Sequence, residues 1–85
     1  MVRSTRSDPY SALIVALIEA RRGAGLRQVD LAQRLGKPQS FVSKVENGER
    51  RLDVVEFLVI ARAIGVGAVD VIAKIEPLID EGFNL

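Results

Sequence analysis

Four hydrogen-bonding side chains alternate with two valines in a short stretch between residues 36 and 49. On a helix, the spacing of the valines places both on one face and leaves the polar groups on the other. Amide, hydroxyl and ammonium groups suit the edges of DNA bases, because glutamine can bind adenine through two hydrogen bonds and lysine can bind guanine or a phosphate. An ordinary solvated helix face is the competing interpretation. The polar residues are Gln39, Ser40, Ser43 and Lys44, and the apolar ones are Val42 and Val45.

Two short helices joined by a sharp turn must position this polar face. We predict one helix over 28–35 and a second from Pro38 to about residue 47, with Gly36 ending the first in a left-handed conformation. The linker 36–38 is too short for antiparallel packing, and the small Ala32 lies where the two axes would cross. Leu31, Leu35, Val42 and Val45 would close the crossing from inside. The spacing predicts a helix-turn-helix, whose second helix is narrow enough for the DNA major groove.

Three further helices complete an all-α fold, for which we expect a compact five-helix bundle. Asp8-Pro9 is a helix-start signal for a segment over 10–22, and Asp53 with Glu56 forms a capping-box pattern for another that ends at Gly65. The fifth covers about 68–75, and the tail after it has room for one extra turn. The residues expected to face inward are Leu13, Leu17, Ala20, Phe57, Leu58, Ala61, Ile64, Val69 and Ile72.

Composition argues against catalysis, metals and membranes. The 85 residues include neither cysteine nor histidine, which removes a zinc site of the usual kind and a histidine-dependent triad. The neighbouring carboxylates of Asp80 and Glu81 would diverge, and the glycines mark helix ends rather than a phosphate loop. We therefore expect no enzyme activity and no cofactor. The apolar run 12–18 is far too short to span a membrane, and we expect a cytoplasmic protein that joins the nucleoid when bound to DNA.

The charges are unevenly distributed along the chain. Residues 1–51 hold ten Lys and Arg against five acids, whereas residues 52–85 hold two against six. An uneven solvated surface would explain this pattern. So would a chain that turns its first part toward a polyanion such as DNA.

The run GLRQVDLAQRLGKPQSFVSKVENGERRLDVVEFLVIARAIGV, residues 25–66, resembles the phage repressor/Cro-like helix-turn-helix domains, or XRE family. The resemblance implies a lambda-repressor-like fold and a double-stranded DNA partner. It implies that Gln28 holds a phosphate, that Gln39 and Ser40 read base edges, and that Ser43 and Lys44 face the groove. It also implies a structural ion pair between Arg21 and Glu46. The backbone contacts that this resemblance implies come from Gln28, Asn47, Arg50 and Arg51. We expect Arg27 and Lys37 to contact the backbone as well.

The chain departs from the family pattern around the turn. Arg27 replaces the usual serine or threonine, which loses a helix cap but adds a charge beside the expected phosphate site. Lys37 stands where a small apolar residue is common, and Pro38 where a capping hydroxyl is common. The bulky Phe41 could touch a thymine methyl group or cover the turn, and we favour the second.

We divide the chain into a basic N-terminal arm over 1–8 with Arg3 and Arg6, a DNA-binding domain over 9–75, and an apolar tail over 76–85. The expected function is a transcriptional regulator, a repressor that binds an inverted-repeat operator as a homodimer. The alternative is an antitoxin or bridging module, whose main partner would be a toxin or the transcription machinery. Apolar residues without an obvious core position suggest a homodimer interface, which the family usually builds from its C-terminal helix: Val15, Val59, Ile75, Ile79 and Phe83.

Overall fold

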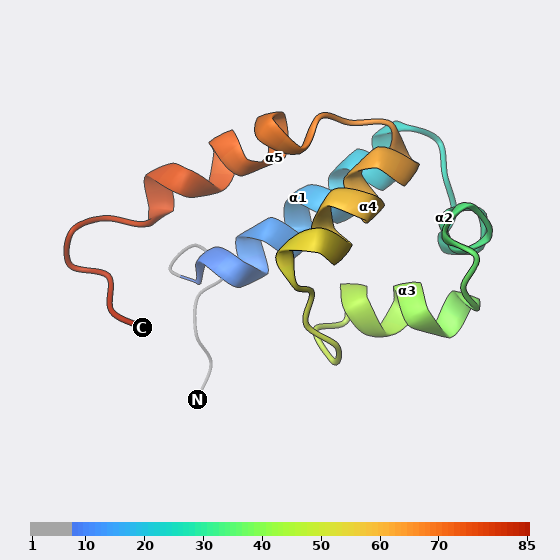
Figure 1. Ribbon diagram of the computed structural model, residues 1–85, viewed down its shortest axis with the longest axis horizontal. Helices are drawn as coiled ribbons and strands as arrows, with labels where there is room; N and C mark the ends of the chain where they lie inside the picture. The colour runs from blue at the N-terminus through green and yellow to red at the C-terminus, as the bar shows by residue number, and fades with distance from the viewer. Residues whose placement is uncertain (1–7) are drawn as a thin grey trace.

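The structure, a computed structural model, describes residues 8–85 and consists of five α-helices and one 3-10 turn (Figure 1). Arg3 and Arg6 of the predicted arm lie outside these residues. No strand occurs between residues 8 and 85, so the predicted all-α fold with an extra C-terminal turn is confirmed. The elements are α1 (Pro9–Gly23), α2 (Gln28–Leu35), α3 (Gln39–Glu46), α4 (Val54–Ile64), α5 (Ala68–Ile75) and η2 (Glu76–Leu78).

Side-chain caps explain where the two longest helices begin. The Asp8 carboxylate accepts a hydrogen bond of 3.1 Å from the Tyr10 amide at the start of α1, which Pro9 opens. At the start of α4, the Asp53 carboxylate accepts from the Glu56 amide at 2.7 Å. The Glu56 carboxylate accepts in return from the Asp53 amide at 3.0 Å. This reciprocal capping box satisfies two backbone donors that a helix start leaves unpaired.

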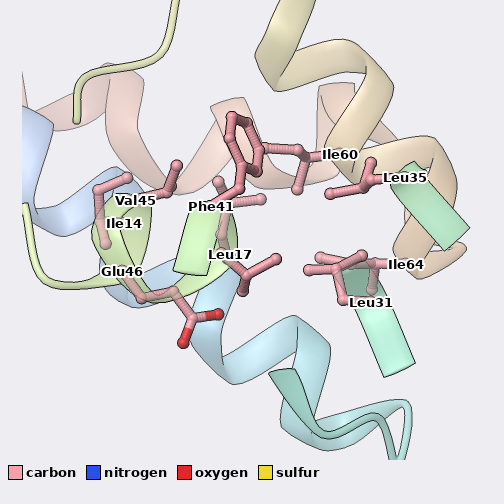
Figure 2. Close-up of a pocket in the computed structure, with 10 residues that line it drawn as sticks. Ile14, Leu17, Leu31, Leu35, Phe41, Val45, Glu46, Ile60 and Ile64 are labelled. Carbon is pink, nitrogen blue, oxygen red and sulfur yellow. The ribbon is translucent and has the colours of Figure 1, made fainter. Parts of the chain in front are cut away.

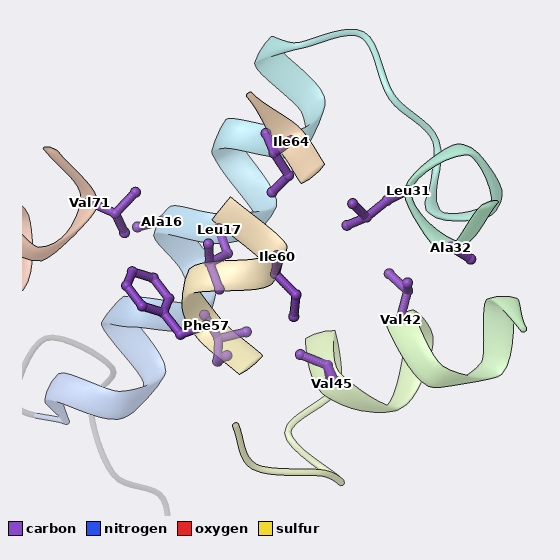
Figure 3. Packing of buried hydrophobic residues seen from close by; sticks show 11 residues of the cluster. Ala16, Leu17, Leu31, Ala32, Val42, Val45, Phe57, Ile60, Ile64 and Val71 are labelled. Atoms are coloured by element: carbon purple, nitrogen blue, oxygen red, sulfur yellow. The ribbon is translucent and has the colours of Figure 1, made fainter. Parts of the chain in front are cut away.

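The core lies between α1 and α4, with α2 and α3 at one end and α5 along α1 (Figure 1). Figure 3 shows the aliphatic side chains that converge between these helices, and Phe57 from α4 among them. The buried apolar residues are Ile14, Ala16, Leu17, Leu31, Ala32, Val42, Val45, Phe57, Ile60, Ala61, Ile64 and Val71.

Three residues that we expected to face inward do not. Leu58, Val69 and Ile72 are 47%, 80% and 43% exposed. In α4 the inward direction is set by Phe57, Ile60, Ala61 and Ile64, and Leu58 lies one residue step of about 100° away from Phe57. In α5 only Val71 is buried. The apolar residues form one broad side opposite Asp70 and Lys74, so periodicity alone did not identify which of them faces inward.

Candidate nucleic-acid interface

Gly36 makes the corner between α2 and α3. It adopts a left-handed conformation with φ of 67°, which glycine takes without the steric cost that other residues incur. The following amide, that of Lys37, donates a hydrogen bond of 3.0 Å to the Ala32 carbonyl and so closes the end of α2. Ala32 is 1% exposed and Figure 3 shows it directly across from Val42 of α3. The small alanine therefore lets the two helices approach closely at the turn.

The faces of α3 differ in the way expected for a helix that binds a ligand along its outer side. Val42 and Val45 are 2% and 4% exposed, which ties α3 to the core. Three of the four predicted base-contacting side chains are exposed, and the fourth is half-buried. They are Gln39, Ser40 and Lys44, with Ser43 as the half-buried member.

A buried ion pair lies at Glu46, the last residue of α3. Arg21 of α1 donates two hydrogen bonds to the Glu46 carboxylate, from Nε at 2.7 Å and from Nη2 at 2.9 Å. Its Nη1 donates a third to the Leu26 carbonyl at 2.8 Å. The two side chains are only 7% and 9% exposed, so their charges are screened little by water. This is the pair that the family resemblance implies, and it joins α1 to the end of α3.

A hydrogen-bonded chain runs from the ion pair to the exposed face of α3. Gln28, the first residue of α2, donates from Nε2 to Oε1 of Glu46 at 2.8 Å. Its Oε1 in turn accepts a longer hydrogen bond of 3.4 Å from Nε2 of Gln39. The first residues of α2 and α3, both predicted to touch DNA, are therefore neighbours in space.

Phe41 covers the turn rather than projecting from it. Figure 2 shows its ring on the apolar space that it lines together with Leu35, Val45 and Ile60. Two cations lie over the ring, with the Lys37 ammonium 5.4 Å and the Arg50 guanidinium 4.9 Å from its centroid. The structure therefore agrees with the interpretation of Phe41 as a cover for the turn.

Arg50 is held inside the protein's own network. It donates to both carboxylate oxygens of Glu56, at 3.0 and 2.7 Å, and these hydrogen bonds, with one from the Asp53 amide, lower the pKa of Glu56 to about 2. The same pairing raises the pKa of Arg50. We predicted Arg50 as a backbone contact, and here its guanidinium serves first to tie the α3–α4 loop to α4.

Arg51 and Asn47 occupy the same loop. The Arg51 guanidinium lies over the Tyr10 ring, 4.0 Å from the centroid, while the Tyr10 hydroxyl accepts a hydrogen bond of 3.0 Å from the Leu52 amide. Asn47 caps α3, and its amide donates to the Ser43 carbonyl at 2.9 Å. Both Asn47 and Arg51 are exposed, so each can reach a ligand placed along α3.

Arg27 immediately precedes α2, at the end of that helix opposite to Gly36. Its guanidinium and its amide both donate to the Asp30 carboxylate, which lowers the pKa of Asp30 to about 2 and raises that of Arg27. Asp30 thus caps the helix start in place of a residue-27 hydroxyl. The Arg27 side chain remains 77% exposed, beside the start of α2, where backbone amides favour an anion.

Sequence reasoning missed the acids and the aromatic ring that orient these cations. The Arg27–Asp30 spacing of three residues on a helix start is a signal that could have identified that pair. The contacts of Glu56 with Arg50, and of Tyr10 with Arg51, join segments whose proximity only the fold reveals.

These features define a helix-turn-helix protein, and comparison with known proteins agrees. The family model described as "Helix-turn-helix" matches residues 17–71, and the chain belongs to that family. A solved structure of an "XRE-family like protein" from Pseudomonas syringae pv. tomato str. DC3000 shares 51% sequence identity with it. The alignment covers 85% of this chain and 88% of the other, with a TM-score of 0.80. No curated protein matches the chain.

The family membership identifies the chain as a DNA-binding transcription regulator with an XRE-type helix-turn-helix. Such a fold is typical of regulators that are not enzymes. Among the helices of residues 8–85, none has the length and apolar character needed to cross a membrane.

Proposed function

We propose that this chain is a repressor that binds an inverted-repeat operator as a homodimer, with α3 in the major groove. The observation that carries the proposal is the two-sided character of α3. Its valines are buried, while Gln39, Ser40 and Lys44 are exposed on the opposite side. Ser43 is half-buried beside them and would complete the base-reading surface.

Backbone contacts would flank this surface at both ends. Arg27 and the amide of Gln28 lie at the start of α2, while Asn47 and Arg51 lie in the loop after α3. Lys37 would contact phosphates on the turn side from its place over the Phe41 ring. Arg50 would have to leave the Glu56 carboxylate to do the same. Cations at both ends of a recognition helix fix its register on the duplex, and the bases then supply specificity.

A homodimer would supply the second half-site that one small domain lacks. Two α3 helices related by a two-fold axis would read half-sites about 34–36 Å apart, and the operator would mirror that symmetry. Repression then needs only that the bound dimer occupy a promoter.

Selection of bound sequences from a random DNA pool tests this proposal. We expect an enriched inverted repeat with half-site centres about one helical turn apart. Enrichment of a single, unrepeated site would contradict the homodimer, and the absence of any enriched sequence would contradict specific binding. A reporter gene placed behind the selected site should then be silenced when the protein is expressed.

A second candidate function is binding of a protein partner, such as a toxin, by the apolar tail. Ile79 and Phe83 are 48% and 40% exposed, which favours a contact there. Co-expression with the product of a neighbouring gene tests it. A stable complex that dissociates when residues 76–85 are removed would support this function.

A further inference from the structure

The helix α4 is apolar on its outer side as well as on its inner side. A helix that is apolar all round is normally buried all round, so a bare outer side indicates a missing neighbour. This outer strip, defined by four residues, is the largest run of exposed apolar side chains on any one helix between residues 8 and 85. Its members are Val54, Val55, Leu58 and Val59, with exposures of 73%, 67%, 47% and 52%.

Shallow grooves lie on both sides of the outer strip, and the one toward α1 and α5 is the more apolar. One, of about 150 Å³, separates Val55 and Val59 from Phe41 at the α3 side. The other, of about 350 Å³, separates Val54 and Leu58 from α1 and α5. A two-fold contact uses the same surface patch on both partners. A ridge that lies beside a groove can therefore pack into the groove of a second copy.

The charges of α4 are arranged for an antiparallel copy of itself. Asp53 caps its first turn, and the exposed Arg62 lies in its last turn. An antiparallel neighbour would set Arg62 near Asp53 of the partner subunit at both ends of the contact, and it would oppose the two helix dipoles. A parallel neighbour would bring like charges together.

We propose that the outer strip is the homodimer interface, where α4 packs antiparallel against α4 of a second copy about an axis near Leu58. The proposal rests on the proposed function for the dimer and adds the surface that forms it. Stable interfaces cover about 800 Å² on each partner, which is roughly a seventh of the 5921 Å² surface of this chain.

Cross-linking through a single introduced cysteine tests the geometry, because the chain has no cysteine of its own. A disulfide needs Cα atoms closer than about 7 Å, so only a residue near the two-fold axis pairs readily with its own copy. We expect Val59→Cys to form a covalent dimer under mild oxidation. Gln33→Cys is the control, since Gln33 is exposed on α2 and belongs to neither the outer strip nor the tail. Equal cross-linking of both variants, or of neither, would overturn the proposal.

Sedimentation without DNA measures the strength of the contact. We expect Val59→Glu to raise the dimer dissociation constant roughly 30-fold or more, as loss of a central interface residue does. Gln33→Glu introduces the same charge on α2 and should leave the constant unchanged. We expect Arg62→Glu to weaken the dimer more at low salt than at high salt, because it opposes the partner's Asp53.

Three outcomes would overturn the proposal: a monomeric wild-type chain, an unchanged constant for Val59→Glu, or a dimer that is lost only on truncation after Ile75. The last would assign the interface to the tail. Binding of a single half-site to Val59→Glu separates this inference from the proposed function. If Val59→Glu is monomeric but still binds a half-site, the proposed interface is supported. If the wild-type chain is a dimer but binds no half-site, the DNA-reading role of α3 is contradicted instead.

Discussion

Nε2 of Gln28 lies 2.8 Å from Oε1 of Glu46, and this hydrogen bond orients the Gln28 amide between the buried ion pair and α3. Because the amide nitrogen faces Glu46, the oxygen faces Gln39, whose Nε2 lies 3.4 Å away. Gln39 then keeps its own oxygen and a second amide hydrogen for a base. Adenine offers the matching donor and acceptor at N6 and N7.

The Gln39→Ala variant should lose specific affinity. We expect binding to weaken by ~1–3 kcal/mol and the preference at one position of each half-site to relax, because one bidentate base contact is removed. Titration of the selected operator and of single-base variants measures both effects. Gln33→Ala, an exposed glutamine on α2, is the control and should bind as the wild type does. If Gln39→Ala keeps the same base preference at every position of the half-site, Gln39 does not recognise a base.

The Arg51→Ala variant should bind all sequences more weakly. The guanidinium that lies over Tyr10 is exposed, and we propose that it contacts a phosphate. Its loss should reduce the slope of log K against log salt by about one unit. Affinities measured at several salt concentrations test this, with Arg22→Ala on α1 as the control. A slope equal to that of the wild type would exclude a phosphate contact by Arg51.

The Glu46→Gln variant should be strongly destabilised. It keeps the shape of the side chain but leaves the buried Arg21 charge without its partner, at a typical cost of ~3–5 kcal/mol. Urea denaturation measures the free energy of unfolding. The double variant Arg21→Met with Glu46→Leu removes both charges and should be more stable than Glu46→Gln. A single variant as stable as the wild type would show that the pair contributes little to the fold.

Stability should fall in acid as Glu56 loses its charge. Its folded pKa is lowered from 4.5 to about 2, so its contribution is complete above the unfolded value and is lost as pH falls from about 4.5 toward 2. Asp30, lowered from 3.8 to about 2, acts in the same direction. The Glu56→Gln variant should show a shallower decline of unfolding free energy in this window. An identical pH dependence in the variant would contradict the role of the Arg50–Glu56 pair.

Local sequence signals were enough to predict most of the fold. The predicted helix over 28–35 is α2 residue for residue, and the capping box at Asp53 and Glu56 and the left-handed Gly36 are both present. These features depend on neighbours within about four residues in the chain. Short stretches of sequence therefore determine where these helices begin and end.

The inward faces of α4 and α5 were harder to predict because the apolar residues of both helices extend well beyond the buried side. Leu58, Val69 and Ile72 satisfied the same pattern as true core residues, and only packing against α1 distinguishes them. The orientation of the cations also depends on the fold, since Arg50 and Arg51 are held by Glu56 and Tyr10. In the candidate site, the sequence was enough to predict which side chains are polar or charged. It did not reveal which residues from other segments contact them.

The most direct test of the central claim, that the outer face of α3 reads DNA, is an NMR titration of the chain with the selected operator. We predict the largest shifts at the backbone amides of residues 39–47 and at the side-chain amides of Gln28 and Gln39. Large shifts confined to α4, α5 and the tail, with α3 unchanged, would contradict the account.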